Sequence, residues 1–219
     1  MQPTSIELEV CLKALEKSGV PPVNSLGRYI QLLLEWNEKI NLTGAKTPED
    51  IASKHVADVW FALQALGSMS EKVFDVGSGG GIPGILLAIM TPNLQVTLVE
   101  RRQKKANALN SMVSQLDLEG RVTVLARSFE EVPHLDKQSE FWFRGFLPGP
   151  KLAMYLSERF TRADLGRLIL MKGPAWPQEK LDILDQSKVR ENWRQRFAEA
   201  IEIDYSLPHG LGERVLVLV

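Results

Sequence analysis

The chain has 219 residues, a formal net charge of −1 at pH 7, and a composition that is 44% hydrophobic and 24% charged. These proportions exclude a largely disordered chain and are typical of a folded globular protein, with length for one domain plus an extension. The nearly balanced charge argues against a globally basic nucleic-acid binder, although it leaves room for a local basic face.

Membrane and disulfide classes are also disfavoured. No apolar run reaches the length of a membrane span, and the first residues lack a basic-then-apolar signal pattern. Cys11 is the one cysteine in the sequence, so neither an intrachain disulfide nor a cysteine-based metal site can form. We therefore expect a cytoplasmic protein with no metal and no membrane partner.

The N-terminal part of the chain is predicted to be helical. Apolar positions recur at helical spacing in residues 5–18, 24–40 and 47–66. No repeat and no low-complexity linker separates these segments from the rest of the chain. We interpret residues 1–70 as a helical cap docked on a second unit, residues 71–219.

Residues 72–100 carry the most informative pattern. Residues 73–76 are a short apolar run of strand-forming residues that leads directly into the glycines of residues 77–81. A helix is predicted from Ile82 to Met90, and then a second buried strand, residues 95–99, that ends on Glu100. Strand, glycine loop, helix, strand and acid form a nucleotide-binding βαβ unit.

Two ligand classes fit these glycines. Gly79, Gly81 and Gly84 satisfy the dinucleotide pattern G-x-G-x-x-G, with Glu100 near the spacing expected for an acid that binds ribose hydroxyls. Residues 75–81 equally match the first motif of the S-adenosylmethionine methyltransferases, which they resemble. A purely structural glycine turn is a third interpretation.

The second half of the chain favours the methyltransferase interpretation. Helices are expected at residues 104–116, 151–160 and 178–196, and strands at residues 121–126, 168–171, 199–205 and 214–219. Two consecutive strands at the end indicate an antiparallel hairpin that closes an otherwise parallel sheet. Class I methyltransferases end in this way, whereas dinucleotide dehydrogenases usually continue into a substrate domain.

Short motifs along the chain then resemble one family. In chain order they are Trp36-Asn37, Asn41-Leu42-Thr43, Lys54-His55-x-x-Asp58, the stretch from Phe74 to Gly84 with Pro83, Val99-Glu100, Lys104-Lys105, Glu130-Glu131, Arg144-Gly145-Phe146 and Lys172-Gly173. From about Leu26 onward the chain resembles the bacterial small-subunit ribosomal RNA guanine-N7 methyltransferases, also called the glucose-inhibited division protein B family. The Asn-Leu-Thr element and Pro83 are the most specific marks, because many methyltransferases share the glycines.

This resemblance implies a fold and a reaction. The fold would be α/β, a class I S-adenosylmethionine-dependent methyltransferase with a Rossmann-like, mostly parallel sheet ending in an antiparallel hairpin and an N-terminal helical extension. The reaction would be methyl transfer from S-adenosylmethionine to N7 of a guanine in 16S ribosomal RNA. The partner would be 16S ribosomal RNA or the small ribosomal subunit, and we expect a monomer. Because guanine N7 carries a free lone pair at neutral pH, the reaction needs alignment and no general base.

Three sets of site residues are expected from the resemblance and from position. For cofactor binding they are Asp75, Gly77, Gly79, Gly81, Ile82, Glu100, Phe129, Glu130 and Arg144. For orienting the methyl acceptor, as the catalytic set, they are Arg144 and Lys172. For RNA binding they are Asn41, Lys54, His55, Arg101, Arg102, Lys104 and Lys105.

Several of these residues have an alternative role. Asp75 either orients the glycine loop through backbone N–H groups or lies near the cofactor amine. Glu130 is also a typical surface acid, and His55 a typical helix-packing histidine. The basic cluster of Arg101, Arg102, Lys104 and Lys105 is alternatively a solvated helix start. Residues 141–150 depart from the usual family pattern around Arg144, a departure that concerns the methyl-acceptor side and not the cofactor side.

Two other functions stay open. The first is a methyltransferase of the same fold that acts on a small molecule or a protein, which a basic rim around the pocket would argue against. The second is a nicotinamide-dependent oxidoreductase.

Overall fold

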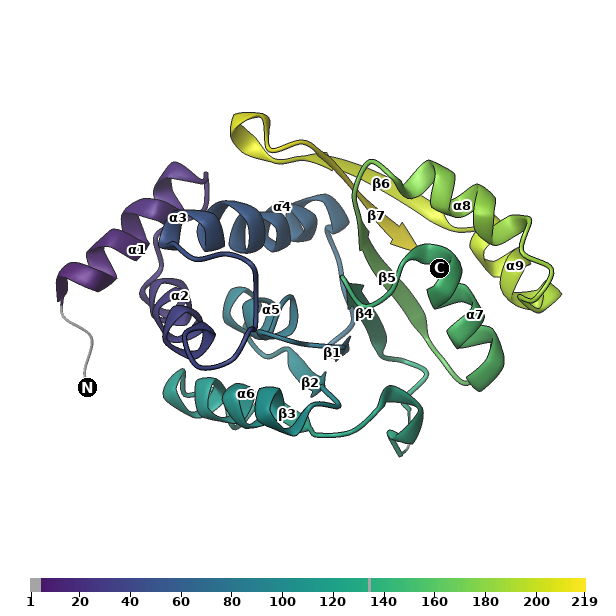
Figure 1. Cartoon of the computed structure of the whole chain (residues 1–219), viewed down its shortest axis with the longest axis horizontal. Helices are drawn as coiled ribbons and strands as arrows, with labels where there is room; N and C mark the ends of the chain where they lie inside the picture. The colour runs from purple at the N-terminus through teal and green to yellow at the C-terminus, as the bar shows by residue number, and fades with distance from the viewer. Residues whose placement is uncertain (1–4, 134) are drawn as a thin grey trace.

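The structure, a computed structural model, describes residues 5–133 and 135–219. One seven-stranded sheet has the order β3-β2-β1-β4-β5-β7-β6 (Figure 1). Its strands are β1 (Lys72–Val76), β2 (Gln95–Val99), β3 (Val122–Leu125), β4 (Glu140–Arg144), β5 (Arg167–Lys172), β6 (Ile201–Ser206) and β7 (Glu213–Leu218). The five strands β1 to β5 are parallel to one another, and β7 is antiparallel to both β5 and β6. The predicted mostly parallel sheet with a terminal antiparallel hairpin is confirmed.

Helices cover both faces of this sheet. They are α1 (Ser5–Lys17), α2 (Asn24–Asn37), α3 (Pro48–Ile51), α4 (Ala57–Leu66), α5 (Gly84–Met90), α6 (Gln103–Gln115), α7 (Gly149–Arg159), α8 (Trp176–Leu184) and α9 (Glu191–Ala198), with a π-helical turn, η1 (Ala52–Val56), between α3 and α4, and 3₁₀ turns η2 (Phe129–Glu131) and η3 (Pro208–Gly210). No helix in the described part of the chain is long and apolar enough to cross a membrane.

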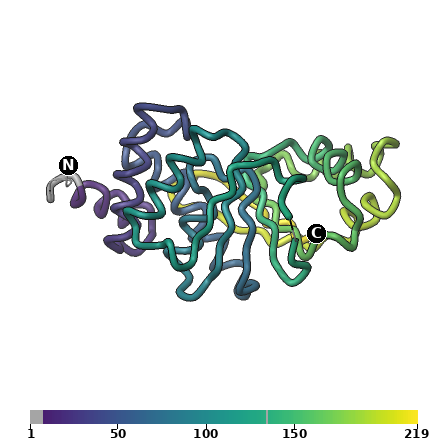
Figure 2. Tube along the Cα trace, turned by 90° about the horizontal axis from the view of Figure 1, so that it is seen from below, coloured from purple at the N-terminus to yellow at the C-terminus, as the bar shows by residue number. Residues whose placement is uncertain are grey.

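The hydrophobic core has two parts, because successive side chains of each strand point to opposite faces of the sheet. On β4, Phe141 and Phe143 belong to a cluster with residues of α7, α8 and α9, whereas Trp142 belongs to a cluster with residues of α1, α2, α4, α5 and α6. Side chains of a strand point alternately to opposite faces, so one apolar run serves both layers. Figure 2 shows the N-terminal helices and the helices of residues 149–198 at opposite ends of an elongated molecule.

The N-terminal helices share their hydrophobic core with the βαβ unit. Tyr29, Ile30 and Leu33 of α2 are fully buried in the same cluster as Ile85 and Leu86 of α5. Helix α4 contacts both α5 and strand β6. The division into units 1–70 and 71–219 stays a prediction, and residues 1–4 of the first unit lie outside the described residues.

The predicted helices differ from the structure in their boundaries, and the helix expected over residues 47–66 is α3, η1 and α4 in turn. Two further differences have a clear physical reason. The helix expected at Ile82 begins at Gly84, because Pro83 occupies the N-cap position and the Gly84 N–H bonds to a side chain of β1. The helix expected over residues 178–196 is two helices, α8 and α9. Between them Val189 is buried, and Arg190 N donates to Ser157 Oγ of α7 at 2.8 Å, which turns the chain back onto α7.

Candidate functional site

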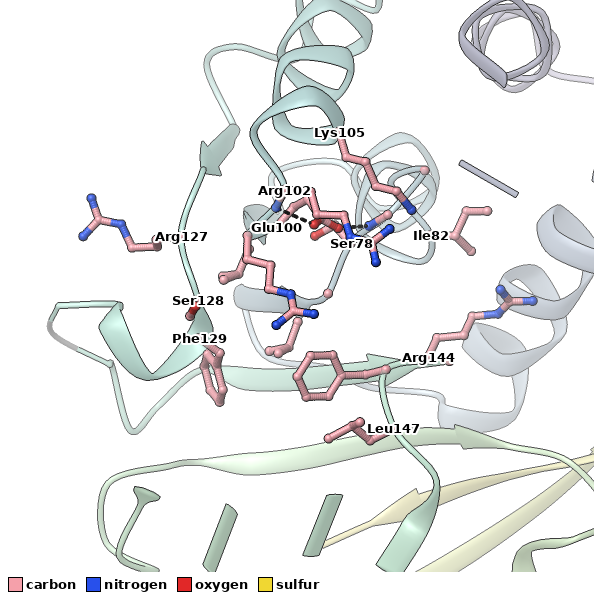
Figure 3. A pocket seen from close by; sticks show the side chains of 18 of the residues that line it. Ser78, Ile82, Glu100, Arg102, Lys105, Arg127, Ser128, Phe129, Arg144 and Leu147 are labelled. Carbon is pink, nitrogen blue, oxygen red and sulfur yellow. Dashed lines mark hydrogen bonds between the residues drawn. The ribbon is translucent and has the colours of Figure 1, made fainter. Parts of the chain in front are cut away.

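A cavity of about 580 Å³ opens at the carboxyl ends of β1, β2 and β4 (Figure 3). This edge is where open α/β sheets bind ligands. Its walls come from the glycine loop, the start of α6, the η2 turn, the segment after β4, and the loop between α2 and α3. The lining residues are Leu42, Thr43, His55, Val76, Gly77, Ser78, Gly79, Gly80, Ile82, Val99, Glu100, Arg101, Arg102, Lys105, Arg127, Ser128, Phe129, Glu130, Arg144, Gly145, Phe146, Leu147, Tyr155 and Arg159.

The glycine loop is held from three directions. Gly77 N donates to Val99 O of β2 at 2.8 Å. Tyr29 of α2 donates its hydroxyl to Gly80 O at 2.9 Å. Asp75, which is 1% exposed, accepts from Gly84 N at 3.0 Å. Groups on β1, β2 and α2 therefore determine the conformation of the loop.

Asp75 lies outside the cavity lining, so the structure supports the first of its two predicted roles, as a support of the glycine loop. Burial raises the pKa of its carboxyl to about 7, and the Gly84 N–H opposes that rise. Gly81 also lies outside the lining. Its φ of +84° and the 2.5 Å from a built Cβ to Ile85 Cδ1 show that it is needed for the turn into α5.

Gly77 and Gly79 line the cavity, and both have positive φ, +79° and +55°. A Cβ on Gly77 would lie 2.6 Å from Phe146 Cδ2, so no side chain fits between the loop and that ring. A Cβ on Gly79 would meet no heavy atom closer than 3.8 Å and would enter free volume. The backbone at Gly79 therefore leaves room for a ligand to lie against it.

Glu100 bridges two loops at the cavity wall. It is 7% exposed, Oε2 accepts from Gly79 N at 3.1 Å, and Oε1 accepts from Arg102 N at 2.8 Å. Each carboxylate oxygen has a second lone pair, so two acceptors stay available to hydroxyl donors. This geometry fits the predicted contact with both hydroxyls of a ribose.

The η2 turn forms the wall beyond Glu100. Phe129 is 3% exposed, and its ring packs against Phe141, Phe143 and Phe160 while it borders the cavity. Glu130 accepts a hydrogen bond from Tyr155 Oη at 2.5 Å and lies 3.6 Å from Arg159 Nε. Phe129 provides an apolar surface, and Glu130 is an exposed acid whose carboxylate is already hydrogen-bonded.

Basic side chains dominate the cavity lining. They are Arg101, Arg102, Lys105, Arg127, Arg144 and Arg159, against the two acids Glu100 and Glu130. Figure 3 shows Arg102 and Lys105 together at the start of α6, with Arg127 on a neighbouring wall. The cavity therefore has the basic rim that favours a polyanionic substrate over a small neutral one.

Arg144 ends strand β4 on the other side of the cavity from Ser128 and Phe129 (Figure 3). Its Nε donates to Asp58 Oδ2 at 2.9 Å, and its Nη2 donates to Lys54 O at 3.0 Å and lies 3.1 Å from His55 Nδ1. Tyr205 of β6 donates to the other Asp58 oxygen at 2.7 Å. Arg144 thus joins the sheet to α4 and η1 at the cavity edge.

The Asn-Leu-Thr element is part of the same wall. Asn37 Oδ1 accepts from Leu42 N at 2.9 Å and from Thr43 N at 3.0 Å, and Asn37 Nδ2 donates to Ala45 O at 2.9 Å. Thr43 Oγ1 lies 2.6 Å from His55 Nε2. Burial, reinforced by the positive charge of Arg144, lowers the pKa of His55 to about 4, so its ring is neutral at pH 7.

Six predicted site residues lie outside the cavity lining: Asn41, Lys54, Asp75, Gly81, Lys104 and Lys172. Lys54 pairs with Asp50 one helical turn away. Asn41 and Lys104 are exposed beside the lining. Lys172 Nζ donates a hydrogen bond to Glu179 Oε2 at 2.8 Å, and this ion pair holds the start of α8 to β5. Its predicted role in orienting the acceptor therefore finds no support in this geometry.

The structure also adds residues that the sequence did not indicate. Tyr29 supports the glycine loop, and Tyr155 and Arg127 line the cavity. These residues are far from the glycine motif in sequence, and they carry no local pattern that marks them. In the unusual segment after β4, Gly145 has a φ of +64°, and Phe146 and Leu147 form a cavity wall.

Among the described residues no group of three or more His, Cys, Asp or Glu side chains is arranged to hold a metal ion.

Comparison with known proteins identifies relatives along most of the chain. A family model described as rRNA small subunit methyltransferase G matches residues 23–203. The ribosomal RNA small subunit methyltransferase G of Xylella fastidiosa is 33% identical over 218 residues, covering 97% of this chain and 93% of the relative. That of Paracoccus denitrificans is 32% identical over 169 residues, covering 77% of this chain and 82% of the relative.

Solved structures are similar in fold. An O-methyltransferase from Streptomyces achromogenes involved in tomaymycin synthesis, solved in complex with S-adenosylmethionine, has a TM-score of 0.52 at 14% identity and covers 87% of this chain and 89% of that one. At this identity the likeness shows the class I methyltransferase fold alone. The family match and the curated relatives show more, and the chain belongs to the rRNA small subunit methyltransferase G family.

Proposed function

We propose that this protein transfers a methyl group from S-adenosylmethionine to N7 of a guanine in 16S ribosomal RNA. The observation that carries the proposal is the cavity at the carboxyl ends of β1, β2 and β4. It combines the buried acid Glu100 with a rim of cations that includes Arg101, Arg102 and Lys105. Family membership supplies the reaction class.

The residues present fit S-adenosylmethionine. The open volume beside Gly79 admits a ligand against the backbone, Glu100 offers two free acceptors to ribose hydroxyls, and Phe129 offers an apolar surface to an adenine ring. When bound, this cofactor supplies an electrophilic sulfonium methyl group. Asp75 and Gly81 would act indirectly, by fixing the loop.

The residues of the acceptor side then need only to orient the base. Guanine N7 would supply its own lone pair to the methyl carbon, and the bonding pair of the broken carbon–sulfur bond would stay on sulfur. No proton leaves N7, and the products are S-adenosylhomocysteine and a cationic N7-methylguanine. Alignment of two bound reactants contributes on the order of 7–11 kcal/mol, so no acid–base pair is required.

The RNA contact is proposed at the start of α6. Arg101, Arg102, Lys104 and Lys105 have no carboxylate within ion-pair distance among the described residues. Cations at a helix N-terminus oppose the helix dipole and cost stability. Their position beside the cavity favours the interpretation as phosphate contacts over that of a solvated helix start. A basic rim likewise argues against a small-molecule or protein substrate.

Partner and location follow from the same proposal. A substrate in the small ribosomal subunit of a bacterium would place the protein in the cytoplasm. We also propose that it acts as a monomer, which sedimentation of the purified protein would test.

The test is methyl transfer followed by mapping. Small subunits from cells that lack this protein are incubated with the purified protein and labelled S-adenosylmethionine. The RNA is then reduced with borohydride and treated with aniline, which cleaves the chain at N7-methylguanosine. One new cleavage site in 16S RNA is expected. Labelled RNA without such cleavage would contradict N7 as the target, and no label at all would contradict the function.

A further inference from the structure

The hydrogen bonds between Arg144, His55 and Thr43 run in one direction only. A guanidinium has five N–H donors and no acceptor. Arg144 Nη2 lies 3.1 Å from His55 Nδ1, so Nδ1 must accept and carries no hydrogen. The neutral imidazole then has its single N–H on Nε2. Because Nε2 lies 2.6 Å from Thr43 Oγ1, His55 donates to the Thr43 hydroxyl.

The Thr43 hydroxyl oxygen receives a second hydrogen bond. Ala45 N donates to the same Oγ1 at 3.2 Å. A hydroxyl oxygen has two lone pairs, and both are now used. The remaining O–H hydrogen of Thr43 finds no acceptor among the described residues, and Thr43 lines the cavity. Arg144 and His55 thus force Thr43 to present a donor, and no acceptor, to the cavity.

Guanine and adenine differ at the position that such a donor would meet. Both present the acceptor N7 on this edge, but guanine has the acceptor O6 beside it, whereas adenine has the donor N6 amino group. A base whose N7 faces the methyl donor turns this neighbouring group toward the acceptor-side wall. A hydroxyl limited to donation can bond O6 and cannot bond the amino group.

We propose that Thr43 makes the site specific for guanine by donating its hydroxyl to O6, with the direction of that bond imposed by Arg144 through His55. This inference rests on the proposed function. It assigns His55 and Arg144 the role of positioning residues, and Thr43 the contact with the base.

The test compares two bases in one enzyme. The guanosine mapped above is replaced, by RNA ligation and subunit reconstitution, with 2-aminopurine riboside, which keeps N7 and lacks O6. We expect wild type to methylate the guanine substrate roughly tenfold or more faster in kcat/KM, as for one hydrogen bond in a desolvated site. Thr43→Val should lower this ratio of rates by roughly the same factor, because the intrinsic difference between the two bases is common to both enzymes, and Thr43→Ser should keep the wild-type ratio.

A matched control lies four residues away. Thr47 caps α3 by accepting from Asp50 N and lies outside the cavity, so Thr47→Val should leave the preference for guanine unchanged. Each ratio compares two substrates within one variant, so a partly unfolded fraction cancels. If Thr43→Val slows both substrates equally and keeps the wild-type ratio, Thr43 is structural and the inference is wrong. Wild type that methylates neither substrate contradicts the proposed function instead.

The direction of the hydrogen bonds from Arg144 to His55 and from His55 to Thr43 can also be measured without an activity assay. In ¹⁵N-labelled protein at pH 7, the ring nitrogens of His55, assigned by comparison with His55→Gln, should show a hydrogen on Nε2 and none on Nδ1. A hydrogen on Nδ1 would overturn the inference, because Thr43 could then donate to Nε2 rather than to a base.

Discussion

Arg144 and Asp58 form a mostly buried ion pair, with 2.9 Å from Arg144 Nε to Asp58 Oδ2 and side chains that are 21% and 7% exposed. The pair joins the end of β4 to α4, and Tyr205 extends it to β6. Arg144, expected from the sequence to contact cofactor and acceptor, makes three hydrogen bonds within the protein itself. These contacts fix Arg144 at the wall of the cavity.

Removal of Asp58 should therefore lower stability as well as activity. In Asp58→Ala the Arg144 guanidinium and the Tyr205 hydroxyl lose their shared acceptor, which should reduce the free energy of unfolding by about 3 kcal/mol. Urea denaturation followed by tryptophan fluorescence measures this loss. Glu9→Gln, which breaks the exposed pair with Lys13, is the control and should cause no measurable change. An equal stability for Asp58→Ala and wild type would show that the pair is not structural.

Loss of Glu100 should act on the cofactor. Glu100→Ala removes the acceptors that we assign to the ribose, so affinity for S-adenosylhomocysteine should fall by roughly 1–3 kcal/mol, a factor of about 5 to 150. Titration calorimetry measures it directly. Glu119→Gln, an exposed acid remote from the cavity, should bind as wild type does. Unchanged affinity in Glu100→Ala would remove Glu100 from the cofactor site.

Stability should depend on pH through His55. Its pKa is about 4 in the folded protein, against an ordinary value of 6.5, so between these values the unfolded chain binds a proton that the folded protein does not. His55 should therefore lower the free energy of unfolding by about 3 kcal/mol as pH decreases from 6.5 to 4. Asp75 acts in the opposite direction over this range, because its raised pKa makes the folded protein bind the extra proton. Urea denaturation of wild type and His55→Gln across that pH range measures the contribution of His55, as the difference between their free energies of unfolding. Parallel curves for the two proteins would contradict the buried, neutral ring.

Charge reversal at α6 should weaken substrate binding without affecting the cofactor. Lys104 is exposed and outside the cavity lining, so Lys104→Glu should raise KM for small subunits and leave affinity for S-adenosylhomocysteine unchanged. Lys137→Glu, the same reversal near the opposite end of β4, is the control. Wild-type log affinity should fall with log salt by about 0.7–0.9 for each phosphate contact. If both variants had the same KM and the affinity of wild type did not change with salt, the RNA would not bind at the start of α6.

The form of the substrate is a related prediction. The few cations beside the cavity imply weak binding to free RNA, so an assembled or partly assembled small subunit should be methylated faster than deproteinised RNA. Initial rates on both substrates, at matched RNA concentration, measure the difference. Equal rates would mean that the RNA alone carries the recognition.

Local patterns in the sequence determined most of the βαβ unit. The short apolar run before the glycines, the strand of residues 95–99 and the acid that follows it are read from neighbouring residues, because strand pairing and a tight glycine turn leave a direct mark on composition. The antiparallel ending was likewise apparent from two strands without a helix between them. The same patterns placed Gly77, Gly79 and Glu100 at one cavity, and the family resemblance added Phe129, where the structure has them.

Only the tertiary structure decided what the remaining polar residues contact. Asp75 faces α5 rather than the cavity, Lys172 pairs with Glu179, and Arg144 pairs with a residue 86 positions away. A side chain's partner depends on which elements pack against its strand end, and sequence spacing carries no such information. For the same physical reason, the direction of the hydrogen bonds from Arg144 to Thr43 emerges only when three separate segments meet at one wall.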